Sequence, residues 1–144
     1  MKIYLANCLG FYPKQRARRV PEMVSDIRGH GIEVHEPLGH VGDMIERGTV
    51  QSNDLTRIAE IDLESLSSCD AMIATTEGSG DSTDPGVCIE VGYAIAKGIR
   101  VFVVHDRDIE RPQLNAMFYA PGISIHDSWE SMFKALLNEF DVLS

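Results

Sequence analysis

The chain has 144 residues and a formal net charge of -9 at pH 7, and 44% of its residues are apolar and 24% charged. This is the size and composition of a globular domain, so one domain over residues 1–144 is expected. The acidic charge argues against nonspecific binding to nucleic acid or to an anionic membrane, since both need a basic surface, although a single pocket need not share that sign.

The first half of the chain predicts strands that alternate with helices. The apolar run "KIYLA" (2–6) predicts a first strand. The segment "PKQRARRVPEMVSDIRGHG" (13–31) has helical spacing, and its apolar face is made of Val20, Met23, Val24 and Ile27. Pro21 either breaks this helix or starts a second segment. "IEVHEP" (32–37) predicts a second strand, and residues 38–51 predict a long loop with at most a short helix.

The second half continues the alternation. A helix is predicted over residues 52–70, capped by Ser52 or Asn53, with an inner face made of Leu55, Ile58, Ile61 (or Asp62) and Leu66. "AMIATT" (71–76) predicts a third strand, and a loop leads to a helix over 86–98 that Gly98 ends. Strands at 100–105 and 123–125 and a last helix at 127–140, capped by Asp127 or Ser128, complete the prediction.

This order predicts an α/β fold, a three-layer doubly wound (flavodoxin/Rossmann-like) five-stranded parallel sheet with helices on both faces. The strands are nearly continuous apolar runs, which is typical of a parallel sheet that is covered on both sides. In such folds ligands bind beyond the carboxyl ends of the strands. The segments expected at that edge are residues 6–11, 75–86 and 105–119.

Cysteine and histidine usage gives expectations about location and metals. Cys8, Cys69 and Cys88 are odd in number and form no CxxC, so a disulfide framework is not expected and a reducing cytoplasm is. The N-terminus is too short in apolar residues for a signal peptide, and no run approaches the roughly 20 apolar residues of a membrane span. His35 and His40 lack metal-ligand spacing and are expected at the surface, so no metal is expected.

Three carboxylates are candidates for chemistry. Glu90 is the one charge in the interior of "DPGVCIEVGYAIAKG" (84–98), and a charge in such an apolar setting is costly unless it is paired or used. We expect the nearby helix N-terminus to favour its ionised form. Asp84 is either a helix cap or a ligand contact, and Asp62 is either on a solvated helix face or functional.

Other nucleotide-binding and nucleophilic motifs are absent. No GxGxxG follows the first strand, and "EGSGDS" lacks the Gly-Lys-Ser/Thr ending of a P-loop, so neither a dinucleotide site nor a P-loop is predicted. Cys88 lies two residues before Glu90, but no histidine occupies a recognisable partner position. We expect Cys88 to be a packing residue.

Four segments together resemble the nucleoside 2-deoxyribosyltransferase family. They are "KIYLAN" with "GF", "EIDLESLSSCDAMIA", "DPGVCIEVGYAIAKGIRVFVV" and "QLNAMF". The third is specific, and the others keep the family's order and spacing. The chain departs from the family at "ANCLGFYPK", where "AGP" is commoner, and at Ile99-Arg100, where Lys-Pro is common.

The resemblance implies a homo-oligomeric transferase that moves 2-deoxyribose between nucleobases without a cofactor. It implies that Glu90 is the nucleophile of a retaining double displacement, that Tyr4 orients it and that Asp62 donates a proton to the departing base. It further implies that Asp84 and Gly86 contact the sugar. Phe11 would stack on the base, and Asn115 would reach into a neighbouring subunit's site.

Two other readings share the same pocket. A 2′-deoxynucleoside 5′-monophosphate N-glycosidase would use the same glutamate with water as acceptor, and Arg16, Arg18 and Arg19 would offset the acidic residues near its phosphate. A nucleotide-binding domain without catalysis would need neither Glu90 nor Asp62 nor Tyr4.

Overall fold

The computed structural model describes residues 1–76, 83–105 and 114–142. Within them, five parallel strands form one sheet in the order β2-β1-β3-β4-β5. The strands are β1 (Lys2–Asn7), β2 (Glu33–His35), β3 (Ala71–Thr75), β4 (Arg100–Val104) and β5 (Ile123–His126). The predicted α/β fold with a five-stranded parallel sheet is confirmed, and the order is that of flavodoxin-like folds.

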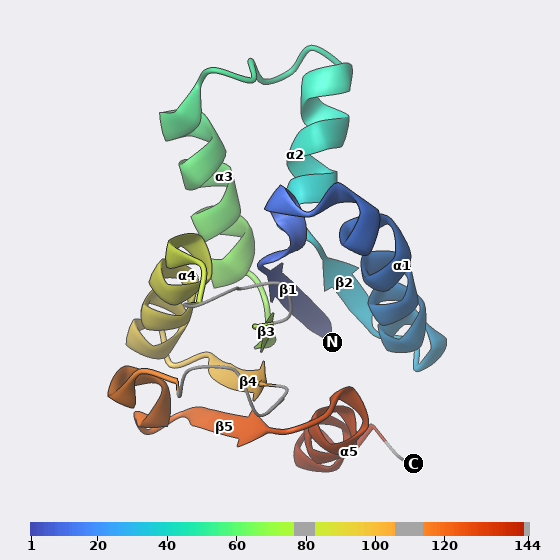
Figure 1. Cartoon of the computed structure of the whole chain (residues 1–144), viewed down its shortest axis with the longest axis vertical. Helices are drawn as coiled ribbons and strands as arrows, with labels where there is room; N and C mark the ends of the chain where they lie inside the picture. Colours follow the sequence, from blue (N-terminus) through green and yellow to red (C-terminus); the bar gives the residue numbers. More distant parts are fainter. Residues whose placement is uncertain (77–82, 106–113, 143–144) are drawn as a thin grey trace.

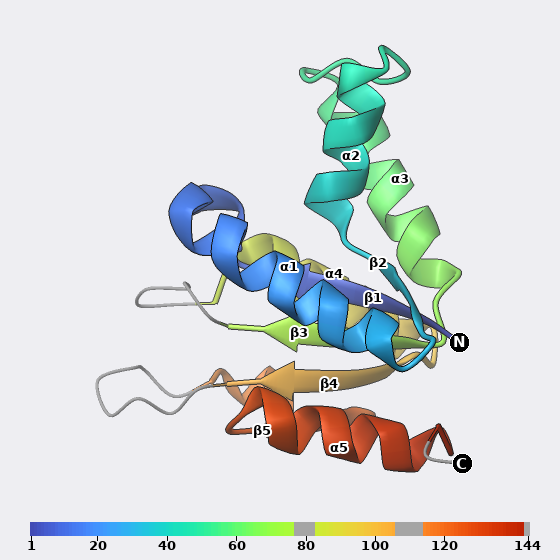
Figure 2. The same ribbon diagram turned by 90° about the vertical axis from the view of Figure 1, so that its right-hand side faces the viewer.

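Helices cover both faces of the sheet (Figure 1). The helices are α1 (Pro13–Gly29), α2 (Pro37–Glu46), α3 (Leu55–Ser67), α4 (Pro85–Ala96) and α5 (Trp129–Glu139), with short 3-10 helices η1 (Leu9–Phe11) and η2 (Ala116–Tyr119). Helices α1 and α5 pack on one face, and α4 with the end of α3 packs on the other. Helix α2 and the first part of α3 extend away from the sheet (Figure 2).

The alternation of β1 decides which of its side chains meets which helix layer. Ile3 and Leu5 belong to the core under α1 and α5, whereas Tyr4 and Ala6 belong to the core under α4. Successive side chains of a strand point to opposite faces, so this division follows directly from the sequence. Tyr4 is fully buried and lies on the side of the sheet that carries α4.

Several local predictions are corrected by the structure. Pro21 lies inside α1 without ending it. Asp54, and not Ser52 or Asn53, caps α3 by accepting a hydrogen bond from the Arg57 amide. Leu55 was predicted on the inner face of α3 but is 72% exposed, because it occupies the first turn, beyond the edge of the sheet.

Two boundaries also differ, and one alternative is decided. Helix α2 starts at Pro37, where the sequence predicted the end of a strand followed by a long loop with at most a short helix, and it is 10 residues long. Proline fits the first turn of a helix because its missing N–H has no intrahelical partner there. Ser128, one of two predicted candidates, caps α5. No helix among the described residues is long and apolar enough to cross a membrane.

Candidate active site

A cavity of about 250 Å³ opens at the carboxyl edge of the sheet, on the face that carries α4. Its walls come from the end of β1, the start of α2, the middle of α3 and the first turns of α4. The lining residues are Asn7, Cys8, Gly10, Pro37, Leu38, Asp62, Asp84, Gly86, Val87 and Glu90. Three of the sequence-predicted carboxylates therefore share one cavity, at the edge where parallel α/β sheets bind their ligands.

The carboxyl group of Glu90 is bound by a residue of the first strand, β1. The Tyr4 hydroxyl donates a hydrogen bond of 2.6 Å to Glu90 Oε1. Glu90 lies in the second turn of α4, between the buried residues Val87 and Val91, so its carboxyl group is partly withdrawn from water. Burial is also the main reason why the pKa of Tyr4 lies far above its ordinary value, with the Glu90 charge adding to the effect, and the phenol stays protonated as a donor.

The protonation of Glu90 differs from the sequence-based expectation. Burial raises its pKa to about 7, the hydrogen bond from Tyr4 lowers it, and the charges of Asp62, Asp84 and Glu36 raise it further. The helix N-terminus was expected to favour the ionised form, but burial outweighs that effect. A carboxylate that is half ionised near neutral pH suits a nucleophile that must form and release an ester.

Asp62 meets the cavity from α3. Its Oδ1 atom is buried and has no hydrogen-bond partner among the described residues. Burial raises the pKa of Asp62 to about 6, although the charge of His40 opposes the shift and that of Glu36 adds to it. Asp62 is therefore not on a solvated helix face, and near neutral pH a fraction of it carries a proton that it can donate.

Asp84 is both a helix cap and a lining residue of the cavity. Its Oδ1 atom accepts hydrogen bonds from the amides of Gly86 (2.8 Å) and Val87 (3.2 Å), which begin α4. A Cβ atom on Gly86 would lie 2.9 Å from the same oxygen, so glycine leaves room for the capping carboxylate. Both alternatives foreseen for Asp84 are thus compatible, since one carboxylate oxygen caps the helix and the other remains for a ligand.

Two further candidates stand apart from this list of lining residues, for different reasons. Asn115 is exposed and caps η2 by accepting a hydrogen bond of 3.0 Å from the Met117 amide. Phe11 ends η1, and its side chain lies outside the described part of the structure.

Sequence reasoning missed the polar residues around the start of α2. Asn7 lines the cavity and donates a hydrogen bond of 2.9 Å to Glu36, which is also paired with Arg16. His35, predicted at the surface, is half-buried and stacks on Tyr4 with ring centroids 5.5 Å apart. Burial, followed by the charges of His40 and Lys2, lowers the pKa of His35 to about 4. The sequence did contain one signal for these residues: Asn7 and His35 are the last residues of β1 and β2, at the edge where ligands bind.

Cys88 also differs from its prediction. It is exposed on α4 and does not belong to the buried core that α4 forms with the sheet, so it is not a packing residue. No group of three or more His, Cys, Asp or Glu side chains among the described residues is arranged to hold a metal ion.

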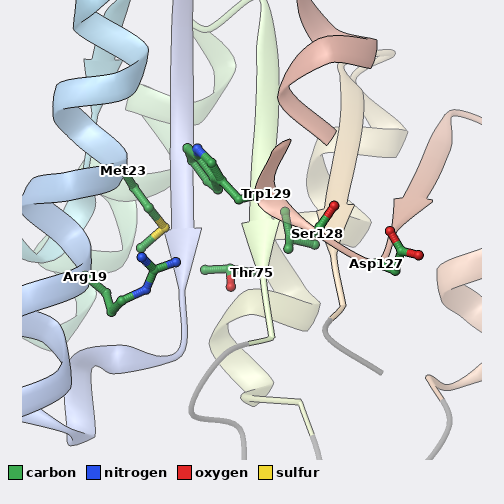
Figure 3. Close-up of a pocket in the computed structure, with 7 residues that line it drawn as sticks. Arg19, Met23, Thr75, Asp127, Ser128 and Trp129 are labelled. Carbon is green, nitrogen blue, oxygen red and sulfur yellow. The ribbon is translucent and has the colours of Figure 1, made fainter. Parts of the chain in front are cut away.

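A second cavity, of about 300 Å³, lies on the opposite face of the sheet, between α1 and α5 (Figure 3). Figure 3 shows Arg19 and Met23 on one side and Trp129, Ser128 and Asp127 on the other. Its described lining includes one carboxylate, that of Asp127, whereas the cavity at Glu90 brings three together. Paired carboxylates are what general acid and nucleophilic chemistry need, so the cavity at Glu90 is the candidate active site.

Comparisons with known proteins give a family match and similar folds. The family model described as nucleoside 2-deoxyribosyltransferase matches residues 3–130. A comparison with curated protein sequences gives no significant match.

Among solved structures, the fold is similar to a 2-desoxiribosyltransferase from Leishmania mexicana (TM-score 0.70, 20% identity, covering 95% of this chain and 97% of that one). A 2-deoxyribosyltransferase from Bacillus psychrosaccharolyticus gives a TM-score of 0.65 at 19% identity, covering 91% and 89%. A CMP N-glycosidase from Clostridium botulinum gives 0.59 at 16% identity, covering 97% and 99%. At these identities the structural similarity shows that the fold is shared, and it shows nothing further.

Proposed function

The chain belongs to the nucleoside 2-deoxyribosyltransferase family, and from this premise we propose that it transfers 2-deoxyribose between nucleobases through a covalent intermediate on Glu90. The family acts on nucleosides and nucleobases. The observation that carries the proposal is the hydrogen bond from Tyr4 to Glu90, at a cavity that Asp62 and Asp84 also line. It supplies an oriented nucleophile and a separate proton donor in one site.

In the first step the ionised Glu90 carboxylate attacks C1′ of the deoxynucleoside. The bond between C1′ and the base nitrogen breaks, and its electron pair leaves with the base. Protonated Asp62 gives its proton to the base, which departs neutral, while the sugar stays on Glu90 as an ester. Tyr4 does not line the cavity and acts as a positioning residue, through its hydrogen bond to Glu90.

In the second step an acceptor base attacks C1′ from the opposite face. Asp62, now ionised, takes a proton from the incoming base, and the bond between C1′ and Glu90 breaks with its electron pair returning to the carboxylate. Two inversions give net retention at C1′. Both carboxylates return to their starting protonation states.

The proposed sugar and base contacts carry the family resemblance over to this site. We assign Asp84 Oδ2 to a sugar hydroxyl, with Gly86 keeping the turn open, and we assign Phe11 to the base. Asn115 is assigned to the site of a second copy of this chain, since it does not line its own. Its neighbours Met117 and Tyr119 on η2 are 74% and 65% exposed, and burying them against another subunit is favourable.

The charges around the cavity favour a neutral donor. Among the described residues, its lining includes three carboxylates and no lysine or arginine, a poor setting for a phosphate. Arg16 pairs with Glu36, and Arg19 pairs with Glu22 and lines the cavity on the other face. Two of the three arginines considered for a phosphate are thus engaged elsewhere.

A hydrolase remains the second candidate, supported by the likeness to a CMP N-glycosidase over nearly the whole chain. Water would replace the acceptor base in the second step, and Glu90 and Asp62 would keep their roles.

The test is a chromatographic assay of purified protein. Thymidine or deoxyinosine is incubated with adenine, and deoxynucleoside monophosphates are incubated alone. We expect deoxyadenosine in the first mixture and none with the Glu90→Ala variant. Free base from the monophosphates alone would favour the hydrolase. Binding of nucleosides with neither product would mean a binding domain.

A further inference from the structure

The Glu36 carboxylate ties three segments of the chain together at the cavity wall. Its Oε1 atom accepts hydrogen bonds of 2.9 Å from Asn7 Nδ2 and 2.9 Å from Arg16 Nη1, and its Oε2 atom accepts 2.5 Å from Arg16 Nη2 and 2.7 Å from the Gly39 amide. The donors come from the end of β1, from α1 and from the first turn of α2. The Glu36 side chain is only 9% exposed, and these four bonds fill its acceptor capacity. Glu36 is therefore not arranged to contact a substrate.

The bonds fix the residues that face the ligand. Asn7 lines the cavity, and its Oδ1 atom accepts a hydrogen bond of 3.1 Å from the Leu9 amide, so both ends of its amide are held by the protein. Leu38, two residues after Glu36, lines the same wall. A Cβ atom on Gly10 would lie 2.7 Å from Leu38 Cδ1, and one on Gly39 would lie 3.0 Å from Glu36 Oε2. The wall is packed closely around this carboxylate.

The pair also bears on the charges in the cavity. Burial opposes ionisation of Glu36, but the hydrogen bonds from Arg16, Asn7 and Gly39 outweigh it and hold its pKa below the ordinary value. The resulting negative charge acts on both reactive carboxylates. Burial raises the pKa of Asp62, the charge of His40 lowers it, and the charge of Glu36 raises it further. Burial also raises the pKa of Glu90 and the hydrogen bond from Tyr4 lowers it, while the charges of Asp62, Asp84 and Glu36 raise it further. The positive charge of Arg16 is ion-paired with this Glu36 carboxylate.

We propose that Arg16 and Glu36 are positioning residues of the active site, which hold the wall made by Asn7 and Leu38 and keep an uncompensated negative charge away from the reactive carboxylates. The inference rests on the proposed function, since it assigns the pair a part in the same reaction. A buried ion pair is a weak source of net stability, so a role in shaping and neutralising the site explains its presence better.

The test compares Arg16→Gln, Glu36→Gln, the double variant and Arg16→Lys. Two quantities are measured: the carboxyl titration of Glu90 by ¹³C NMR, assigned with Glu90→Gln, and the pH profile of kcat/KM for transfer. Removing Arg16 leaves a negative charge uncompensated, so Glu90 titrates higher and the acid limb moves up by on the order of half to one pH unit. Glu36→Gln moves both down, and the double variant returns them toward wild type.

Arg16→Lys separates the two roles. It keeps the charge but cannot make the paired hydrogen bonds, so Glu90 titrates as in wild type while KM rises severalfold through the looser wall. Variants that unfold more easily while Glu90 titrates unchanged in all four would overturn the inference. The NMR titration needs no turnover, so it tests the ion pair even if the transfer assay shows that the proposed function is wrong.

Discussion

Tyr4 and Glu90 lie 86 positions apart in sequence, yet the phenol oxygen is 2.6 Å from the carboxylate oxygen. The tyrosine is fully buried in the first strand of the sheet, and the glutamate lies on the helix that packs over it. Because this donor is packed inside the sheet, the direction of the carboxylate is set by the sheet itself and not by a surface loop.

Tyr4→Phe should slow transfer by about 10- to 100-fold at pH 7, because a hydrogen bond to a charged group is lost without a change in shape. The lost bond lowered the pKa of Glu90, so its removal moves the acid limb of kcat/KM to higher pH. The pH profiles of kcat/KM for the wild type and the Tyr4→Phe variant check this prediction. Equal losses at every pH would mean that Tyr4 does not act on the ionisation of Glu90.

Glu90→Gln should abolish transfer and stabilise the fold above pH 7. The folded-state pKa of about 7 lies above the ordinary 4.5, so the contribution of Glu90 to stability is fully present below pH 4.5 and is lost as the pH rises toward and through 7. The neutral amide escapes this loss, which is worth about 1–3 kcal/mol. Urea unfolding at pH 8 should show the variant more stable, with the difference vanishing near pH 4.5. A variant that is less stable at pH 8 would contradict the assigned burial.

The pH profile of the wild-type enzyme should be a narrow bell. Glu90 must be ionised, which favours pH above about 7, and Asp62 must be protonated, which favours pH below about 6. Because the two carboxyl groups interact, the apparent pKa values of the two limbs describe Glu90 and Asp62 together, and the pH optimum lies between them. In Asp62→Asn the alkaline limb disappears and turnover falls most for bases that leave poorly. An unchanged alkaline limb would remove Asp62 from its role as proton donor.

Asp84 offers a pair of variants that separates its two roles. Asp84→Asn keeps an oxygen that accepts from the Gly86 and Val87 amides, so the stability of the fold should change little. Asp84→Ala loses the cap and costs about 1 kcal/mol. Both should weaken nucleoside binding by a similar factor, because the carboxylate is lost in each. If only Asp84→Ala loses affinity, the residue is a cap and nothing more.

Asn115 should act across a subunit interface. Glu90→Ala and Asn115→Ala are each expected to be inactive alone. If Asn115 serves a neighbouring site, mixing the two chains under conditions that exchange subunits places intact Glu90 and intact Asn115 at some shared sites, and activity returns. Light scattering reports the oligomer. An Asn115→Ala chain that is monomeric and fully active would exclude the assignment.

The regular elements could be predicted from the sequence because their signals are local. The apolar runs of the strands and the lone carboxylate in the apolar helix led to the sheet and to Glu90. Leu55 was misplaced because periodicity does not show where a helix leaves the sheet. The start of α2 at Pro37 was assigned to the end of a strand because the proline was interpreted as a stop, and Gly39 and Gly42 obscured the helical spacing of the apolar residues that follow.

The missed site residues depend on long-range contacts. Nothing near Glu36 in the sequence shows that Arg16, twenty residues earlier, will face it from another helix. His35 was predicted at the surface because its burial comes from Tyr4, a residue on the neighbouring strand. Such pairs are set by the order of strands in the sheet, which short-range patterns do not encode.

The separation between Tyr4 and Glu90 has a consequence for the making of the protein. During synthesis the tyrosine emerges among the first residues, but its partner belongs to a helix that ends at Ala96. Until β3 is paired beside β1 and α4 has docked, the Tyr4 hydroxyl lacks its Glu90 acceptor and the Glu90 carboxylate is not oriented. The nascent chain therefore has no assembled candidate site until most of its length has been translated. Any activity of the site would appear only once the tertiary structure is complete.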